Sequence, residues 1–134
     1  MEFHRGRLID HIELRVADLQ KSRAFYSAVL GTLGLDISFE TPDFVAFDEF
    51  VVEKADGYVS RIHLAFQAED ADAVQRFHAA GLANGGTDNG APGERSYHPG
   101  YYAAFVLDPD GNNVEAVWHG PATRSAASVV ITAD

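Results

Sequence analysis

The chain has 134 residues, which is enough for one folded domain with a sizeable core. It contains no cysteine, which excludes disulfides and cysteine-ligated zinc, so any metal must be held by His, Asp or Glu. A net charge of −10 with scattered basic residues argues against nucleic-acid binding, and no segment reaches the roughly 20 apolar residues that span a membrane. The opening residues, MEFHRGRLIDH, lack the apolar stretch of a secretion signal, so we expect a cytoplasmic protein.

The first half predicts a strand, a helix and three short strands. Residues 8–16 alternate between apolar and polar side chains, which is typical of a strand with one buried face, and His11 lies on the polar face. Asp18 is a suitable N-cap for a helix that runs to about Leu30 or Leu33. The short strands are expected at 36–40, 44–48 and 50–54.

The second half repeats this order at an offset of 52 residues, from 11 to 63. A strand carries His63 on its polar face, Asp70 is the expected N-cap, and the helix is expected to end near Gly81. When the two halves are aligned at this offset, identical residues fall at equivalent positions: Asp18 with Asp70, Phe25 with Phe77, Leu30 with Leu82 and Gly34 with Gly86.

The closing segments of the second half are less regular. Short strands are expected at 85–88, 101–107 and 112–118, while 85–100 is rich in Gly and Pro and is expected to be mostly loop, a candidate lid. The residues that follow, 120–134, are expected to form a mobile tail up to Ser128, after which VVIT would form an edge strand or a dimer contact.

The resulting order is β-α-β-β-β, twice, in an α+β fold. We expect tandem modules that form a curved mixed sheet, with the helices on its outer face and a concave cup on the other. His11, His63 and Glu115 all lie on the polar face of their strands. Two imidazoles and a carboxylate placed in this way predict one metal site in the cup.

This order resembles the vicinal oxygen chelate superfamily, which includes glyoxalase I, extradiol dioxygenases, fosfomycin-resistance enzymes, methylmalonyl-CoA epimerase and bleomycin-binding proteins. The resemblance covers residues 8–119 and implies one domain over 1–119, with modules at about 6–55 and 60–119 and a tail at 120–134. Three stretches carry it: DHIELRVADLQKSRAFYSAVLGTLGL, IHLAFQAEDADAVQRFHAAG and YYAAFVLDPDGNNVEAVWH.

The resemblance implies the metal ligands His11, His63 and Glu115, because the first strand of each module and the last strand of the second supply them in that superfamily. Such a triad has open positions and suits a divalent metal ion, namely Zn, Fe(II), Mn or Ni. Some members add a fourth ligand from the first module, for which Glu53 is the nearest match, and an exposed carboxylate is the alternative for Glu53.

His98 stands where extradiol dioxygenases carry a signature histidine. The aliphatic–tyrosine pair of that signature is Ala104-Phe105 here, so the substrate-orienting hydroxyl is missing and ring cleavage is disfavoured. His98 and Glu53 are candidates for proton transfer, with a loop-surface role as the alternative for His98. We expect His4 and His119 to be surface or terminal residues. The candidates for the pocket mouth are Arg95, Tyr97, Tyr101 and Tyr102.

Two functions follow from this pattern. The first is a metal-dependent lyase, isomerase or dioxygenase whose small-molecule substrate chelates the metal through adjacent oxygens. The alternative is a drug- or small-molecule-sequestering protein of the bleomycin-resistance type, which an acidic, aromatic-lined groove would suit. The filled triad favours the enzyme. Superfamily members pair their modules within one chain or across a homodimer, and the sequence leaves both arrangements open.

Overall fold

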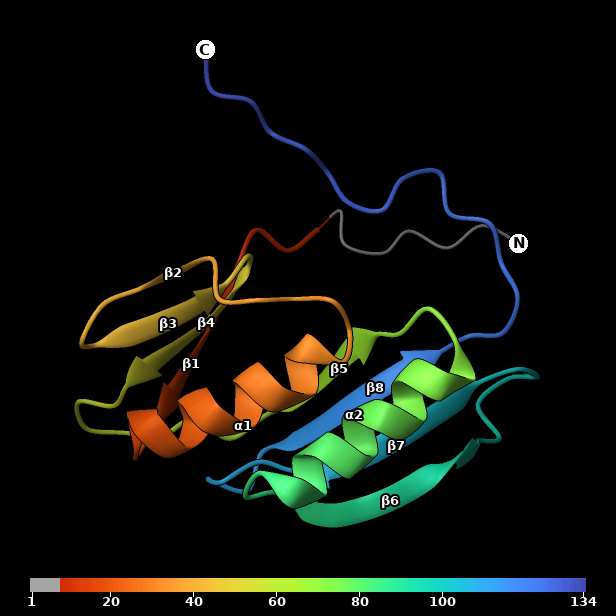
Figure 1. Cartoon of the computed structure of the whole chain (residues 1–134), viewed down its shortest axis with the longest axis horizontal. Coiled ribbons are helices and arrows are strands. Elements are labelled where there is room, and N and C mark those ends of the chain that lie inside the picture. The colour runs from red at the N-terminus through yellow and green to blue at the C-terminus, as the bar shows by residue number, and fades with distance from the viewer. Residues whose placement is uncertain (1–7) are drawn as a thin grey trace.

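A computed structural model describes residues 8–134 and contains two βαβββ modules (Figure 1). The α+β fold with tandem modules is therefore confirmed. The predicted domain start at residue 1, the module start at 6 and His4 lie outside the described residues. The first module comprises β1 (Ile12–Val16), α1 (Leu19–Gly31), β2 (Phe39–Glu40), β3 (Phe44–Phe47) and β4 (Phe50–Lys54). The second comprises β5 (His63–Gln67), α2 (Ala71–Ala83), β6 (Thr87–Glu94), β7 (Tyr102–Leu107) and β8 (Asn113–Trp118).

The two modules have the same sheet topology. Their strand orders are β1-β4-β3-β2 and β5-β8-β7-β6, so the first strand of each module lies at one edge and pairs in parallel with the last. The other pairs are antiparallel. Within residues 8–134 the strands form two separate ladders of four. Residues that are equivalent in the repeat therefore belong to different sheets.

Both helices begin at the predicted aspartates. The Asp18 carboxylate accepts a hydrogen bond from the backbone N–H of Lys21 at 3.1 Å, and Asp70 accepts one from Ala73 at 2.7 Å. These caps satisfy N–H groups that the first turn leaves without a partner. The helices pack side by side, and α2 covers one face of β7 and β8 (Figure 1). Neither of these two helices has the length and apolar character needed to cross a membrane.

One hydrophobic core joins the modules. It contains buried side chains from both helices and both sheets. Phe50 of β4 contacts Phe66 of β5 with ring centroids 5.4 Å apart in an edge-to-face arrangement, and Phe66 in turn lies 6.3 Å from Phe77 of α2. Each fully buried side chain of this size contributes about 1.5–3 kcal/mol, so the modules stabilise one another.

The prediction that 85–100 is mostly loop is wrong for Thr87–Glu94, because these residues form β6, of which the predicted strand at 85–88 covers only the start. This strand pairs with β7 through two register shifts, at Asp88/Gly90 and Gly90/Gly93. Such bulges add residues that the partner strand does not match, and an edge strand tolerates a proline because its outer side has no ladder. The Gly and Pro content that suggested a loop belongs to a bulged edge strand.

The second helix ends near Gly81, as predicted, since α2 runs to Ala83, but Gly81 itself lies within the helix. A Cβ atom at Gly81 would lie only 3.0 Å from Cγ1 of Val106, so glycine here allows the helix to approach β7 closely. The chain turns afterwards at Gly85, whose φ is +94°. The predicted VVIT edge strand is absent, since residues 120–134 form neither helix nor strand and extend away from the sheets (Figure 1).

A buried hydrogen bond ties α1 to the turn between β7 and β8. The Tyr26 hydroxyl donates to Oδ2 of Asp108 at 2.6 Å, and both residues are buried. The same carboxylate accepts hydrogen bonds from the backbone N–H of Asp110 and from Asn112. Burial, followed by the charge and hydrogen bond of Asp108, raises the pKa of Tyr26 well above its ordinary value of 10.0. The turn is thus held by a neutral phenol facing a carboxylate.

We predict that Tyr26→Phe lowers the free energy of unfolding by about 1–2 kcal/mol at pH 7, because a hydrogen bond to a charged group is lost. The wild type should also lose stability as the pH rises above about 10, by up to about 1.4 kcal/mol per pH unit, because the unfolded phenol ionises there and the folded one does not. The variant lacks this contribution. Urea unfolding between pH 7 and 11 measures both effects.

Tyr102→Phe is the matched control, because its exposed hydroxyl only accepts a hydrogen bond from Nε2 of Gln75. It should change stability by less than about 0.5 kcal/mol at pH 7. Equal losses in the two variants would contradict the buried Tyr26–Asp108 link.

Candidate functional site

Glu115 and His63 form the centre of the site on the second sheet. Parallel pairing of β5 with β8 places His63 beside this carboxylate, with its Nε2 2.8 Å from Oε1 of Glu115. Glu115 is only 1% exposed, whereas the His63 side chain is 54% exposed. A buried carboxylate therefore lies directly beneath an imidazole that is open to solvent.

The second oxygen of Glu115 is also bonded. The Tyr101 hydroxyl, just before β7, donates a hydrogen bond to Oε2. Phe105 pairs with Glu115 across β7 and β8, and its ring lies 6.0 Å from that of His63. A carboxylate without partners would be costly to bury, and two donors in fixed positions offset that cost. Tyr101, predicted to line the pocket mouth, is therefore in contact with the predicted ligand Glu115.

His98 and His119 form a stacked pair next to Tyr101. Their rings are 5.1 Å apart and nearly parallel, and Nε2 of His98 lies 2.8 Å from Nδ1 of His119. Nδ1 of His98 donates to the carbonyl of Pro99, so in the neutral pair Nε2 of His98 accepts from His119. Both rings meet Tyr101 edge to face. These imidazoles lie one side chain away from Glu115.

Sequence reasoning placed His119 at the surface and missed its contact with His98. The sequence contained a signal for this position of His119. Residues 115, 117 and 119 are spaced by two, so on an extension of β8 their side chains lie on the same face. Phe105 pairs with Glu115 and therefore lies on the same face of the sheet. Tyr101 is an even number of residues from Phe105, so it lies on this face as well. The conformation of the loop that brings His98 to His119 has no such signal.

His11 and Glu53 lie on the other sheet. His11 immediately precedes β1, is 63% exposed and contacts Asp10 through Nδ1 at 2.6 Å. Glu53 is on β4, with a carboxylate oxygen 3.8 Å from Arg15. No cluster of three or more metal-ligating side chains occurs among residues 8–134. One chain therefore brings His63 and Glu115 together but does not bring His11 or Glu53 to them.

The remaining pocket candidates lie in two places. Tyr97 is 72% exposed and packs against Tyr101, and the Arg95 guanidinium lies 5.3 Å from the centre of the Phe105 ring. Both are therefore near the His63–Glu115 pair. Tyr102 packs instead against the core on the opposite face, next to Gln75 of α2.

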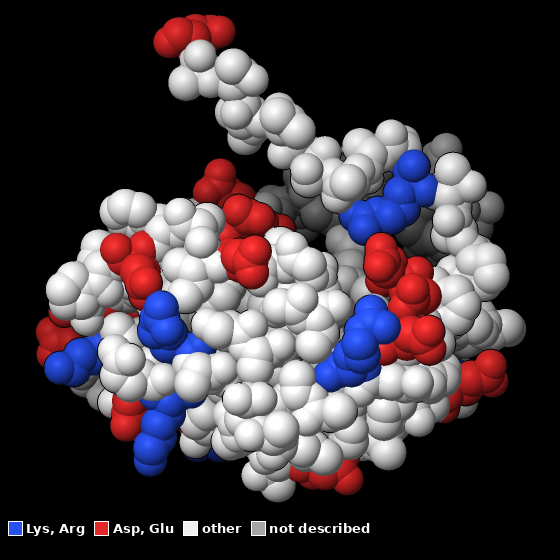
Figure 2. Space-filling model, viewed as in Figure 1, with Lys and Arg blue, Asp and Glu red and all other residues white. Residues whose placement is uncertain are grey.

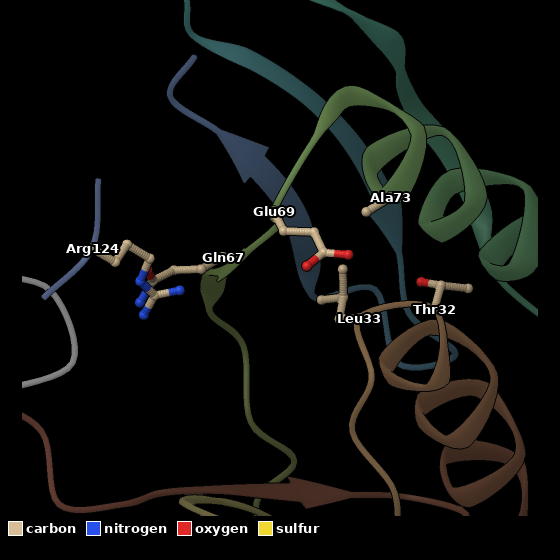
Figure 3. A pocket seen from close by; sticks show the side chains of 6 residues that line it. All are labelled: Thr32, Leu33, Gln67, Glu69, Ala73 and Arg124. Carbon is tan, nitrogen blue, oxygen red and sulfur yellow. The ribbon is translucent and has the colours of Figure 1, made fainter. Parts of the chain in front are cut away.

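A partly open cavity of about 130 Å³ lies elsewhere (Figure 3). Thr32 and Leu33 at the end of α1, Gln67, Glu69 and Ala73 near the start of α2, and Arg124 of the tail surround it. None of the candidate site residues lines it. Figure 2 shows the face that carries both helices, where acidic and basic side chains are scattered among uncharged ones. The candidate site is therefore separate from this cavity, and its His63 side chain is open to solvent.

Comparison with known proteins identifies the family. A model of the Glyoxalase/Bleomycin resistance protein/Dioxygenase superfamily matches residues 8–116. The chain belongs to this superfamily. A crystal structure of a glyoxalase/bleomycin resistance protein from Albidiferax ferrireducens T118 is 33% identical, with a TM-score of 0.71, and the match covers 82% of this chain and 97% of that one. No curated protein matches significantly.

Two further superfamily structures show the shared fold. Lactoylglutathione lyase from Agrobacterium tumefaciens is 23% identical, with a TM-score of 0.62, over 83% of this chain and 92% of that one. A glyoxalase I mutant from Zea mays is 23% identical, with a TM-score of 0.58, over 81% of this chain and 45% of that one. At this level of identity both likenesses show the shared fold.

We predict that Tyr101→Phe destabilises the protein by about 1–3 kcal/mol, because it leaves an oxygen of the buried Glu115 carboxylate without its donor. Tyr97→Phe removes a hydroxyl from a ring that is mostly exposed and should cost less than about 0.5 kcal/mol. Chemical denaturation of both variants beside the wild type measures the difference. A Tyr101→Phe variant as stable as Tyr97→Phe would show that this hydroxyl does not support Glu115.

Proposed function

We propose that the protein is a metal-dependent enzyme, a lyase, isomerase or oxygenase, that acts on a small molecule with two adjacent oxygens. The observation that carries this proposal is the pairing of an exposed imidazole with a buried carboxylate. Nε2 of His63 and Oε1 of Glu115 point at one another, and a divalent cation is held by this kind of donor pair. When bound, the metal would act as a Lewis acid on the chelated oxygens of the substrate.

The third ligand in this proposal is His11 of a second copy of the chain. His11 and His63 occupy equivalent places in the two sheets, so a two-fold arrangement that places the first-module sheet of one protomer against the second-module sheet of its partner would bring them together. Such a homodimer would contain two identical sites. Glu53 would arrive with His11, as a fourth ligand or a base.

Exposed apolar side chains support this arrangement. Leu8 and Ile9 precede β1, and Tyr58 and Ile62 precede β5; Leu8 is 88% exposed. The strands β1 and β5 are both edge strands. In the proposed dimer the edge strands β1 and β5 of different protomers come together. The partner protomer would then cover the apolar side chains beside these strands and remove them from water.

The stacked histidines supply the proton-transfer group of the proposal. Nδ1 of His98 donates a hydrogen bond to the Pro99 carbonyl, which leaves Nε2 facing His119. A proton can then be accepted or returned through the pair beside Glu115. The aromatic rings of Tyr97 and Tyr101 border this position.

A sequestering protein of the bleomycin-resistance type is the second candidate. Two observations favour it, namely the net charge of −10 and the open, aromatic site face. A cationic ligand would be drawn to such a surface. This candidate requires no metal, so metal binding separates it from the enzyme.

We predict that the wild type binds about one divalent ion per chain and that His11→Ala and His63→Ala each weaken binding by at least about 100-fold, since even residues that only support a ligand cost 10–100-fold. Titration calorimetry with Zn²⁺ and with Ni²⁺ measures the affinity. His78→Ala is the control, because His78 on α2 is bonded to Asp88 on β6 and should keep wild-type binding.

Mixing the two defective variants tests the shared site. After unfolding and joint refolding at equal amounts, about half of the dimers are mixed, and each has one intact site of two, which restores about a quarter of the wild-type sites. No restoration, with each variant still dimeric, would rule out a site shared between copies. A wild type that binds neither ion would overturn the metal enzyme and leave the sequestering protein.

A further inference from the structure

Within residues 8–134, Arg95 is a cation on the site face that forms no ion pair with an acidic side chain. Its guanidinium nitrogens donate to the backbone carbonyls of Ala91 at 2.7 Å, Gly93 at 2.9 Å and Glu94 at 3.3 Å. All three acceptors are neutral, and the ion pairs formed within residues 8–134 do not include Arg95. By contrast, Arg15 and Arg23 each contact carboxylates. Among the half-buried arginines of residues 8–134, namely Arg15, Arg23 and Arg95, only Arg95 has no carboxylate within ion-pair distance.

The backbone is shaped to hold this guanidinium in place. Its carbon lies 5.3 Å from the centre of the Phe105 ring. A Cβ atom at Gly90 would lie 2.9 Å from Cδ2 of Phe105 and 3.2 Å from Nη2 of Arg95, and Gly90 has a φ of +153°. Only glycine fits there without displacing the stack. The three carbonyls and the ring therefore fix a planar donor that still has at least two of its five N–H groups available.

Arg95 also lies within one small molecule's length of the His63–Glu115 pair. The pairing of Phe105 with Glu115 puts the ring on the same face as the carboxylate, and the His63 ring lies 6.0 Å from it. Neighbouring strands are about 4.8 Å apart, so a group above β7 or β6 is roughly 5–10 Å from Glu115. A small organic acid with a short carbon chain or with one substituted aromatic ring has this length.

We propose that Arg95 binds a carboxylate of the ligand, so that the molecule carries adjacent oxygens at one end and a single carboxylate at the other. A planar guanidinium recognises a carboxylate through two parallel hydrogen bonds. One arginine suits one carboxylate and gives no clamp for a polyphosphate. The inference rests on the proposed function for the metal end of the ligand, while the carboxylate end is tested with no metal present.

The test uses the metal-free full chain and two probes of the same shape, benzoate and its neutral analogue benzamide. Binding is followed by NMR at the Nε–H resonance of Arg95, which is assigned by its loss in Arg95→Gln. We expect benzoate to shift this resonance and to bind at least about tenfold more tightly than benzamide. Arg95→Gln should make the two affinities equal, and Arg95→Lys should retain part of the preference.

Arg15→Gln is the matched control, since it removes the same charge from the other sheet and should leave the benzoate preference intact. The proposal is overturned if benzoate leaves the wild-type Arg95 resonance unmoved, if the two probes bind equally, or if both glutamine variants lose the preference to the same extent. If Arg95→Gln does not fold, Arg95→Lys assigns the resonance instead, because lysine has no Nε–H group, and the wild-type resonance then decides the matter. Benzoate recognition in a protein that binds no metal would leave this subsite standing and overturn only the metal enzyme.

Discussion

The buried carboxylate of Glu115 constrains the arrangement of the second sheet. An ionised group in the middle of a sheet loses its hydration, and only well-placed donors offset that loss. Parallel pairing with β5 supplies His63, and the residue before β7 supplies Tyr101. Both partners hold the carboxylate in one orientation. The stacked histidines and the Phe105 ring then pack around groups whose positions are already set.

The duplication explains why the predicted ligands lie on two different sheets. Each module places a histidine at the start of its first strand, at equivalent edges of two separate ladders. The carboxylate, however, is on the last strand of the second module alone. One sheet therefore holds a bonded pair and the other an exposed histidine with Glu53 nearby. Two open edges and the apolar residues beside them are what a second copy would cover.

Local features of the sequence were sufficient for most of the fold. Alternation gave the faces of β1 and β5, and Asp18 and Asp70 capped the helices as expected, because capping and alternation depend on neighbours in the chain. Only the start of the bulged strand β6 was predicted, at 85–88, because its glycines and its proline are tolerated at the edge of a sheet, which local sequence does not reveal. The separation of the two ladders was likewise a matter of long-range packing.

The site was predictable in part for the same reasons. His63 and Glu115 lie together because their strands pair in register, whereas the contact of His98 with His119 depends on the path of residues 95–101.

The central claim is that two imidazoles and a carboxylate hold one metal ion. X-ray absorption spectroscopy of the zinc-loaded wild type tests it most directly. The account predicts two imidazole nitrogens and carboxylate oxygen at about 2.0–2.2 Å, and a spectrum with a single imidazole or none would contradict it.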